Sequence, residues 1–352
     1  MERVVMNYFN YIDSNEFRFD VLTHRLDNRI YADRIEHSGG KVFVFPPFGI
    51  RTLAEITRRF DELLSTRHYD VVHCHMANAA FIYLRIAQKH GVPLRILHSH
   101  QDHYADVWSH AVRNVPLVAA GRRYANYNIA CSKAAGDFLF KDKQYTILKN
   151  GIDVNEFCYS DEKRQAFRNK LGISNKEIIF AYVGRLVPQK NPIFMLDVFS
   201  ACLKKSNADI RLVIAGSGEL EQQMRYHASD LRVDKKIIWL GDIDNVSELD
   251  SGIDVFLMPS LYEGLGLSLI EAQCAGACCF ASDTIPIEAF ATHCVESISL
   301  KSPIDEWAAK IVRCLPDLDI SKRYQLADEI EYSGYNANAS AKQLMNIYEQ
   351  IS

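Results

Sequence analysis

The alternation of short apolar strands with helical stretches is the feature that most constrains this sequence. Runs rich in β-branched and aromatic residues recur between segments with helical spacing, an order that favours parallel sheets with crossover helices. In the first half the expected strands are Phe19–Thr23, Lys41–Phe45, Val71–His75, Leu94–His98, Tyr127–Ala130 and Tyr145–Leu148. In the second half they are Ile178–Val183, Ile210–Ala215, Ile237–Leu240, Val255–Met258 and Cys278–Ala281.

The length of the chain indicates two domains, and one turn separates the strands into two series. The chain has 352 residues, which suits two domains better than one. The stretch from Asn150 to Asp153 has the composition of a turn and separates the two series. We therefore predict an α/β protein of two doubly wound, Rossmann-like domains that face a cleft, the first over residues 1–149 and the second over residues 150–335.

The start of the chain conflicts with this plan. A helix is expected at Glu2–Asn10, directly before the strand Phe19–Thr23. In a doubly wound domain the first strand lies centrally and precedes the first helix, so one N-terminal strand is missing here. We expect that the natural chain begins before Met1; the alternative is that the sheet closes up differently.

Hydropathy and cysteine content narrow the class of protein. No run of about 18 apolar residues is present, so no membrane-spanning helix is expected, and the first residues lack the pattern of a secretory signal. The nine cysteines are scattered without paired metal-binding spacings, which argues against a disulfide framework or a structural zinc site. A reducing cytoplasm is the compartment that these observations favour.

Charge is distributed unevenly between the two halves. Residues 1–150 hold 20 Lys and Arg against 15 Asp and Glu, whereas residues 151–352 hold 20 against 29. A basic first half suits an anionic partner, such as a phospholipid surface or a lipid diphosphate. Peripheral contact with a membrane is one expectation, and scattered solvated charge is an equal alternative.

The strongest chemical signal is the segment SLYEGLGLSLIEA, which follows the strand Val255–Met258. Its two glycines permit a tight loop, and a helix is expected to begin at about Leu267. The amide groups at a helix start form a natural seat for phosphate, and two carboxylates beside it suit hydroxyl-rich groups. The residues predicted to bind such a phosphate-bearing ligand are Gly264, Leu265, Gly266, Leu267 and Glu271, with Glu263 in the loop before them.

Three further loops follow strands of the second half. In GRLVPQKNP, Gly184 allows a sharp turn, and Arg185 and Lys190 could neutralise a pyrophosphate leaving group together. The other two loops are weaker signals: one resembles part of a dinucleotide-binding loop, and one could flank a nucleobase. The residues predicted to bind the same ligand are Gly216 and Gly218 in the first, and Asn245 and Val246 in the second.

Histidines cluster at two expected strand ends of the first half, in VVHCHM and LHSHQDH. Residues two apart share one face of a strand, so His73 with His75, and His98 with His100, could face a common site. A polar wall facing a sugar and an acceptor is the favoured interpretation. Structural histidines are the main alternative, and metal binding is disfavoured because no cysteine completes a ligand set. Asp102 and His103 belong to the same segment.

In order and spacing, the segments GRLVPQKNP, GSGE and SLYEGLGLSLIEA resemble the retaining glycosyltransferases of family 4, which have the GT-B fold. VVHCHM, RILHSH and LKNGID are similar to the N-terminal segments and the hinge of that family. Bacterial exopolysaccharide and capsule transferases are the most similar members. The family normally begins with a strand and a glycine-rich loop, which this sequence lacks.

The resemblance implies a role for individual residues. By position, Glu271 is similar to the residue that binds the donor ribose, Glu263 to the one that contacts the donor sugar, and Arg185 with Lys190 to the pair on the diphosphate. His100 looks like the histidine beside the reacting sugar, with His98 as the runner-up. The catalytic set implied is therefore Arg185, Lys190, Glu263 and His100.

The resemblance also implies no metal requirement, and a final helix, at about residues 336–352, that packs back on the first domain. The expected reaction moves a hexosyl group from a nucleoside-diphosphate sugar, UDP-sugar being favoured, to an acceptor hydroxyl with retained configuration. The acceptor expected is a lipid-linked saccharide in exopolysaccharide or capsule synthesis, at the inner face of the cell membrane. A sugar-nucleotide epimerase of the same fold and a non-catalytic nucleotide-sugar-binding protein are the alternatives; no nucleic-acid partner is expected.

Overall fold

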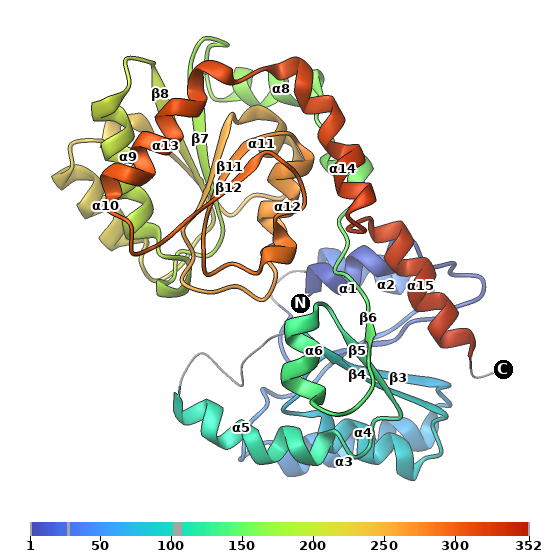
Figure 1. The fold of residues 1–352 in the computed structure, drawn as a ribbon. Helices are drawn as coiled ribbons and strands as arrows, with labels where there is room; N and C mark the ends of the chain where they lie inside the picture. Colours follow the sequence, from blue (N-terminus) through green and yellow to red (C-terminus); the bar gives the residue numbers. More distant parts are fainter. Residues whose placement is uncertain (1, 27–28, 101–107, 351–352) are drawn as a thin grey trace. The chain divides into compact units, whose positions relative to one another are not determined.

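The computed structural model describes residues 2–26, 29–100 and 108–350. The chain divides into two units, one formed by Met1–Gly151 with Ala337–Ser352 and the other by Ile152–Asn336. Within the described residues every strand pairing is parallel (Figure 1). The prediction of an α/β protein with parallel sheets is confirmed.

The second unit is built on a sheet of six strands in the order β12-β11-β10-β7-β8-β9. The first strand of this unit, β7, lies in the middle, and the chain order reverses on its two sides. The predicted strands of this half are all present, with one further strand at the edge. Their bounds are β7 Ile178–Val183, β8 Ile210–Ala215, β9 Ile237–Gly241, β10 Val255–Met258, β11 Cys278–Ser282 and β12 Val295–Ile298.

Both faces of this sheet are buried, which explains why its strands read as continuous apolar runs. Alternate residues of β7 enter opposite cores: Ile179 and Ala181 lie in one apolar cluster, Phe180 and Tyr182 in the other. Helices cover each face (Figure 1). One face packs against α8 Asp161–Lys170, α11 Val246–Gly252 and α12 Leu267–Cys274. The other packs against α9 Pro192–Lys205, α10 Glu221–Asp230 and α13 Ile304–Cys314.

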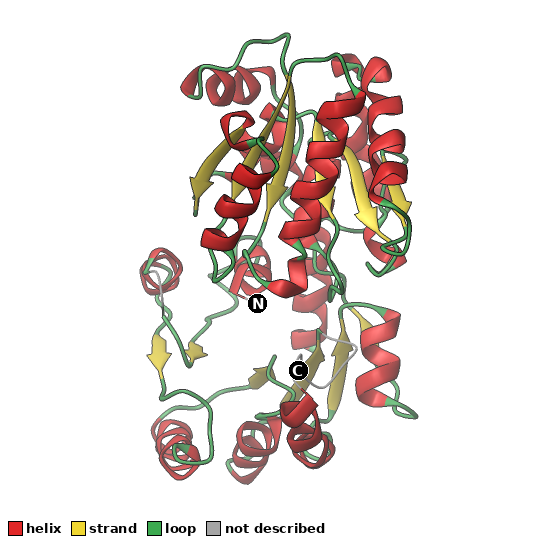
Figure 2. Ribbon diagram, turned by 90° about the vertical axis from the view of Figure 1, so that its left-hand side faces the viewer, coloured by secondary structure: helices red, strands yellow, loops and turns green. Residues whose placement is uncertain are grey.

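The first unit has the same layered plan, but its strands form two separate sheets among the described residues (Figure 2). One contains four strands, in the order β3-β4-β5-β6: Val71–Cys74, Leu94–Ser99, Tyr127–Ala130 and Thr146–Ile147. The other contains β1 Val21–Thr23 and β2 Val42–Val44. The helices of this unit are α1 Glu2–Phe9, α2 Ile30–His37, α3 Leu53–Thr66, α4 Ala80–Lys89, α5 Trp108–Gly121, α6 Lys133–Phe140 and α15 Ala337–Glu349.

The two sheets of the first unit are separated between β1 and β3 among the described residues. The alternative that the sheet closes up around the missing position is wrong, because β1 and β3 are not paired with each other in the described structure. Side chains link the two strands: Asp20, just before β1, accepts hydrogen bonds from Arg67 and Tyr69, which precede β3. The edge strand β1 of the two-stranded sheet is therefore linked to β3 of the four-stranded sheet by side chains, without backbone hydrogen bonds between the two strands.

The last helix, α15, returns to the first unit and packs beside α1. Ser340 donates a hydrogen bond to the carbonyl of Lys149 at 2.9 Å, and Gln343 donates one to the carbonyl of Ile147 at 3.0 Å. From α1, Asn7 donates to the carbonyl of Gly151 at 2.8 Å. Two helices thus hold the segment that leaves this unit.

The short helices α7 Val154–Phe157 and α14 Leu326–Tyr332 complete the second unit. Across the described residues, no helix combines the length and the apolar content that crossing a bilayer requires.

Candidate functional site

The predicted donor residues gather at the carboxyl edge of the six-stranded sheet. β7 pairs with β8 on one side and with β10 on the other, so the loops that follow these three strands are neighbours. The chain order reverses between β7 and β10, and open α/β sheets bind ligands at such a switch point. The loops concerned contain Gly184 to Lys190, Gly216 with Gly218, and Glu263 to Gly266.

The loops after β7 and β8 approach each other so closely that a side chain would not fit. Gly216 has a φ of +129°, and a Cβ atom built on it would lie 2.0 Å from the carbonyl oxygen of Gly184. A Cβ on Gly218 would lie 2.4 Å from the carbonyl oxygen of Leu186. The two glycines of the weak sequence signal are therefore required by backbone packing.

Backbone hydrogen bonds fasten these two loops together. The amide of Leu186 donates to the carbonyl of Ser217 at 2.8 Å, and the carbonyl of Leu186 accepts from the amide of Leu220 at 3.0 Å. The amide of Gly216 donates to the carbonyl of Gly241, at the end of β9, at 2.7 Å. Three consecutive strand ends thus form one fixed edge.

An ion pair spans the switch point itself. The ammonium group of Lys190 lies 2.6 Å from a carboxylate oxygen of Glu263, which joins the loop after β7 to the loop after β10. Both side chains are largely buried, with exposed fractions of 16% and 7%. Removal of either partner would leave the other charge buried without a counter-charge, which is costly. The ion pair therefore helps to hold the two loops together.

Gln189 strengthens the same junction, a role that was not predicted from the sequence. Its side-chain amide donates to the carbonyl of Tyr262 at 3.1 Å, and its backbone carbonyl accepts from the amide of Leu261 at 2.8 Å. Its side-chain oxygen accepts from the guanidinium of Arg185 at 3.2 Å. A neutral side chain within GRLVPQKNP thus positions the predicted phosphate-binding cation.

Helix α12 begins beside this ion pair. Gly266 is its N-cap, with a φ of +89°, a left-handed conformation that favours glycine. Leu265 is buried beneath the loop, and Leu267 is the first helical residue. The first turn of a helix leaves N–H groups without acceptors inside the helix, and the phosphate seat was predicted at this position.

Glu271 lies on α12 and is fully buried, with an exposed fraction of 0%. Burial of a carboxylate is costly, so Glu271 is held in the core by specific contacts. Tyr182, on β7, faces the same edge and donates to the carbonyl of Arg185 at 3.2 Å. Burial, together with the nearby carboxylate of Glu263, raises the pKa of Tyr182 well above its usual value, so it stays a neutral donor.

Asn245 and Val246 follow β9, the edge strand, and lie further along the sheet from the switch point. Asn245 caps helix α11, because its side-chain oxygen accepts a hydrogen bond from the amide of Glu248 at 3.1 Å. Asn245 therefore has a structural role as a helix cap. Its predicted contact with a nucleobase stays a prediction.

The four predicted histidines of the first unit form one stacked cluster. His73 and His98 share a hydrogen bond of 3.1 Å, and His75 and His100 share one of 2.9 Å. The ring centroids of His98 and His100 are 3.9 Å apart. Tyr348, on α15, bonds to the other nitrogen of His73 at 2.8 Å, a partner that the sequence did not reveal.

The histidine cluster is held in its neutral form. Burial, followed by repulsion from neighbouring imidazoles, lowers the pKa of His73 and His98 well below the usual value. Burial lowers the pKa of His75 to about 4, and burial also lowers the pKa of His100 well below its usual value. Neutral imidazoles can accept protons or ligate metals, and candidate ligand atoms of His73, His75 and His98 lie within 4.8 Å of one another.

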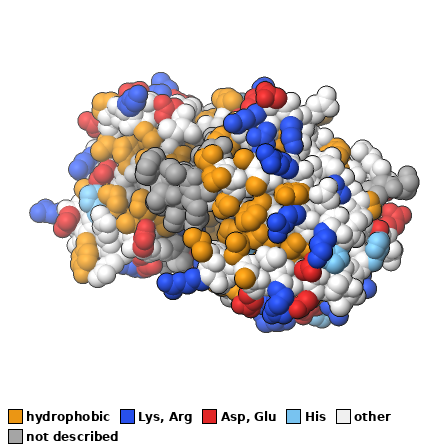
Figure 3. Space-filling view, turned by 90° about the horizontal axis from the view of Figure 1, so that it is seen from below, with side chains coloured by type: hydrophobic (Ala, Val, Ile, Leu, Met, Phe, Trp, Pro, Cys, Tyr) orange, Lys and Arg blue, Asp and Glu red, His pale blue; other side chains and the backbone are white. Residues whose placement is uncertain are grey.

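His100 is therefore placed at the carboxyl edge of the first unit's sheet, just after β4, whereas the other predicted catalytic residues belong to the second unit. Asp102 and His103 lie outside the described residues. Seen from the side on which α3, α4 and α5 lie, the surface carries Lys and Arg side chains beside an area of hydrophobic ones (Figure 3).

Comparison with known proteins matches both units. Residues 1–156 match the family model described as "Glycosyltransferase Family 4", and residues 163–334 match "Glycosyl transferases group 1". The chain is 31% identical over 356 residues to the "Putative glycosyltransferase EpsF" of Bacillus subtilis (strain 168), covering 99% of this chain and 92% of that protein.

A galactosyltransferase and a solved structure are also similar to this chain. An Escherichia coli UDP-Gal:alpha-D-GlcNAc-diphosphoundecaprenol alpha-1,3-galactosyltransferase is 27% identical over 234 residues, which is 63% of this chain and 60% of that enzyme. Among solved structures, Anabaena Alr3699/HepE in complex with UDP and glucose superposes with a TM-score of 0.78 at 17% identity, covering 99% of this chain and 95% of that one. The superposition shows a shared fold.

Proposed function

The chain belongs to glycosyltransferase family 4 and has the GT-B fold, and from this premise we propose that it is a retaining hexosyltransferase. It takes its sugar from a nucleoside diphosphate, with UDP as the favoured nucleotide, and transfers it to an acceptor hydroxyl. The acceptor we propose is a lipid-linked saccharide in exopolysaccharide or capsule synthesis. The EpsF-like and galactosyltransferase relatives support this choice.

The single observation that carries the proposal is the ion pair of Lys190 and Glu263 at the switch point of the second unit. An ammonium group has three donors, and Glu263 uses one of them, so further donors can reach phosphate oxygens. The carboxylate likewise keeps acceptor sites that suit sugar hydroxyls. A cation that suits the diphosphate thus lies beside a carboxylate that suits the hydroxyl groups of the attached sugar.

The chemistry follows from where charge develops. The bond between the anomeric carbon and the diphosphate oxygen breaks, and a new bond forms to the acceptor oxygen on the same face of the sugar. Negative charge grows on the departing diphosphate, and Arg185, Lys190 and the amides at the start of α12 are the groups that stabilise it. No metal is required in this scheme.

Ribose recognition is assigned to Glu271, and Gly184, Gly216, Gly218 and Gly264 let the backbone approach the phosphates. His100 is proposed to act beside the reacting sugar. Its pKa is lowered by burial, so at neutral pH it is an uncharged imidazole that can accept a hydrogen bond or a proton.

A screen of UDP-, GDP- and ADP-sugars tests the donor class. We expect one group of donors to raise the melting temperature and to be hydrolysed slowly without acceptor, and the released or transferred sugar to keep its anomeric configuration by NMR. Conversion of one nucleotide sugar into its epimer without an acceptor would identify an epimerase. Binding with neither transfer nor hydrolysis would identify a non-catalytic binding protein.

Contact with a membrane is a separate part of the proposal. The basic first half and the exposed Lys and Arg side chains beside hydrophobic ones support it (Figure 3). Sedimentation with vesicles of phosphatidylcholine alone and with added phosphatidylglycerol tests it. We expect binding to the anionic vesicles that declines with salt, and equal binding to both would contradict an electrostatic contact.

A further inference from the structure

Two cysteine side chains meet on one face of the six-stranded sheet. Cys278 is the first residue of β11, and Cys314 is the last residue of α13. Their sulfur atoms lie 3.1 Å apart, although the two residues are 36 positions apart in the chain. This distance is only about 1 Å longer than a disulfide bond of roughly 2.05 Å, so a small movement would join the two sulfur atoms.

The topology of the second unit explains this meeting. α13 follows β12 and runs back over the sheet, so its last residue lies over the amino edge, where β11 begins. Cys278 and Phe280 face the apolar cluster that α13 covers, whereas Cys279, between them, faces the opposite cluster. The alternation of the strand therefore selects Cys278, and not its neighbour, as the partner of Cys314.

The elements that carry the two cysteines are fastened to the sheet. The amide of Cys278 donates to the carbonyl of Asp254 at 2.9 Å, beside the ladder between β10 and β11. On α13, the ammonium group of Lys310 lies 3.0 Å from the carboxylate of Glu296 on β12. The indole N–H of Trp307 donates to a backbone carbonyl just after β12, also at 3.0 Å. A paired strand and an anchored helix thus hold the two thiols together.

Solvent can reach this pair of thiols. Cys278 and Cys314 are both half-buried, whereas Cys279 is fully buried. Cys279 has a cysteine neighbour of its own, Cys294, but burial raises the pKa of Cys279 well above its usual value. A thiol in that state is inert, because the thiolate is the reactive form. A small reagent can therefore attack the first pair, while Cys279 is shielded.

The hydrogen bond between the two thiols makes them unequal. The Cys314 thiol donates to the sulfur of Cys278 and thereby lowers the pKa of Cys278. The same bond, followed by burial, raises the pKa of Cys314, and the carboxylates of Asp317 and Glu296 act in the same direction. Cys278 is therefore the thiol that forms the attacking thiolate more readily.

We propose that Cys278 and Cys314 form a site of reversible thiol oxidation, with a low-molecular-weight disulfide such as oxidised glutathione as the oxidant. The Cys278 thiolate attacks one sulfur of the reagent, forms a mixed disulfide and releases one small thiolate. Cys314 then loses its proton, attacks the Cys278 sulfur, forms the internal disulfide and releases the second small thiolate. The two released thiolates take up the two cysteine protons, so the reagent is reduced by two electrons. This proposal does not depend on the proposed function.

The internal disulfide would stabilise the second unit. It joins the end of α13 to the start of β11 and closes a loop that contains β12. A crosslink over 36 positions restricts the unfolded chain, so oxidation should raise the melting temperature by at least about 4 °C. In a reducing compartment the pair stays as two thiols until the pool of small thiols becomes oxidised.

Peptide mapping by mass spectrometry tests the site. The reduced full chain is incubated with oxidised glutathione, the remaining thiols are blocked with N-ethylmaleimide, and crosslinked peptides are compared before and after reduction. We expect one internal disulfide, between Cys278 and Cys314, which disappears on reduction and accompanies the rise in melting temperature. Absence of this crosslink, or its formation only in urea, would overturn the proposal.

Cys279→Ala is the matched control, because Cys279 is adjacent to Cys278 but faces the other side of the sheet. This variant should keep the crosslink and the rise in melting temperature, whereas Cys278→Ala should lose both. The reverse result would contradict the assignment of the pair.

A second variant separates the two chemical steps. Cys314→Ser removes the thiol that resolves the mixed disulfide, so one glutathione should remain on Cys278. Cys158, a half-buried cysteine away from the pair, serves as the reference for an accessible thiol. Glutathione on Cys158 with none on Cys278 would show that the pair is not reactive, and would overturn the proposal.

Discussion

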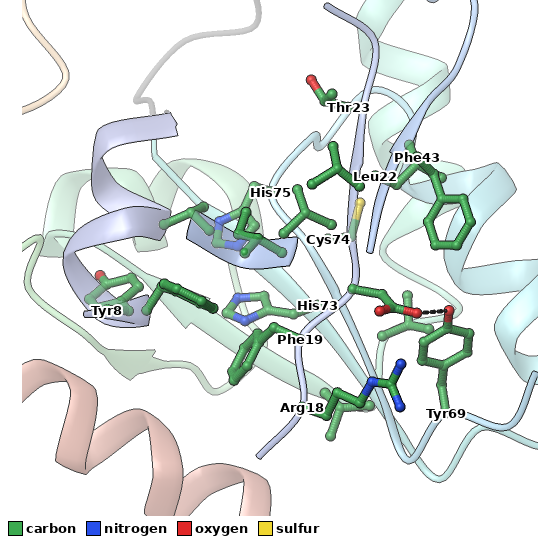
Figure 4. A pocket seen from close by; sticks show the side chains of 18 of the residues that line it. Tyr8, Arg18, Phe19, Leu22, Thr23, Phe43, Tyr69, His73, Cys74 and His75 are labelled. Atoms are coloured by element: carbon green, nitrogen blue, oxygen red, sulfur yellow. Dashed lines mark hydrogen bonds between the residues drawn. The ribbon is translucent and has the colours of Figure 1, made fainter. Parts of the chain in front are cut away.

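The two units differ in what lies at the centre of their sheets. In the second unit β7 is paired on both sides, and the loops at its carboxyl end are tied together by backbone bonds and by the pair of Lys190 and Glu263. In the first unit the equivalent central position is a cavity between β1 and β3. A continuous backbone ladder thus fixes the proposed donor site, whereas the histidine cluster lies at the end of a four-stranded sheet whose β3 edge faces the cavity (Figure 4).

The largest expected effect comes from the centre of the intact sheet. Lys190→Ala should lower turnover by about 10²-fold to 10³-fold, since it removes charge stabilisation from the leaving diphosphate. Initial transfer rates with a saturating donor measure this. Lys235→Ala is the control, because Lys235 lies in the turn just before β9, at the amino edge of the sheet. Unchanged turnover in the Lys190 variant would refute its role with the leaving group.

The next effect concerns the close approach of two loops in the second unit. Gly216→Ala should lower the free energy of unfolding by about 3 kcal/mol, because the added methyl group meets the carbonyl oxygen of Gly184. Gly241→Ala is the matched control: its φ is +65° but the space around it is open, so about 1 kcal/mol is expected. Urea unfolding measures both. Equal losses of unfolding free energy in the two variants would show that the backbone conformation of the glycine, and not the contact with Gly184, sets the cost. The two loops would then be less tightly packed than we describe.

As the pH falls, the first unit should lose stability at a higher pH than the second unit. The pKa of His75 is lowered from about 6.5 in the unfolded chain to about 4 in the fold. The unfolded chain therefore binds more protons between these values, and stability falls as pH decreases from about 6.5 toward 4. Each buried histidine contributes at most about 1.4 kcal/mol per pH unit.

Hydrogen exchange, corrected for its intrinsic pH dependence, measures this unit by unit. Amides of β4 should lose protection between pH 6.5 and pH 5, whereas those of β7 should keep it. Parallel loss in both units would contradict the assignment of the acid response to the histidine cluster.

The smallest effect tests the edge strand β9. Asn245→Ala removes the N-cap of α11 and should cost about 1 kcal/mol of stability. Ser160→Ala removes the corresponding cap of α8 and should cost a similar amount. If Asn245 also flanks a nucleobase, only its variant should weaken nucleotide binding in calorimetry. Equal affinities in the two variants would leave Asn245 with the capping role alone.

Much of this architecture follows from the sequence alone. Apolar runs such as Ile178–Val183 are buried on both faces, so composition and length mark them as strands. Glycines after such runs indicated the site, because Gly216 and Gly266 adopt conformations or contacts that other residues resist. These are local constraints, and local constraints are readable in one sequence.

Other parts of the site depend on contacts between distant residues and were not predictable. Nothing in the residue type of Gln189 indicates that it joins the loop after β7 to Tyr262, 73 positions away. Tyr348 meets His73 across 275 positions because α15 returns to the first unit. The sequence predicted both cations and carboxylates, but their pairing as Lys190 with Glu263 became visible only in three dimensions.

The most direct test of the central claim is the affinity for UDP measured by isothermal titration calorimetry. The account predicts that UDP binds the unaltered protein, and that Arg185→Ala weakens binding by at least about tenfold through loss of a charge-assisted contact to phosphate. Arg225→Ala, which removes an exposed arginine of α10, should bind UDP as the unaltered protein does. Equal affinity in the Arg185 variant, or no binding of any nucleoside diphosphate, would contradict the placement of the donor site at the carboxyl edge of β7.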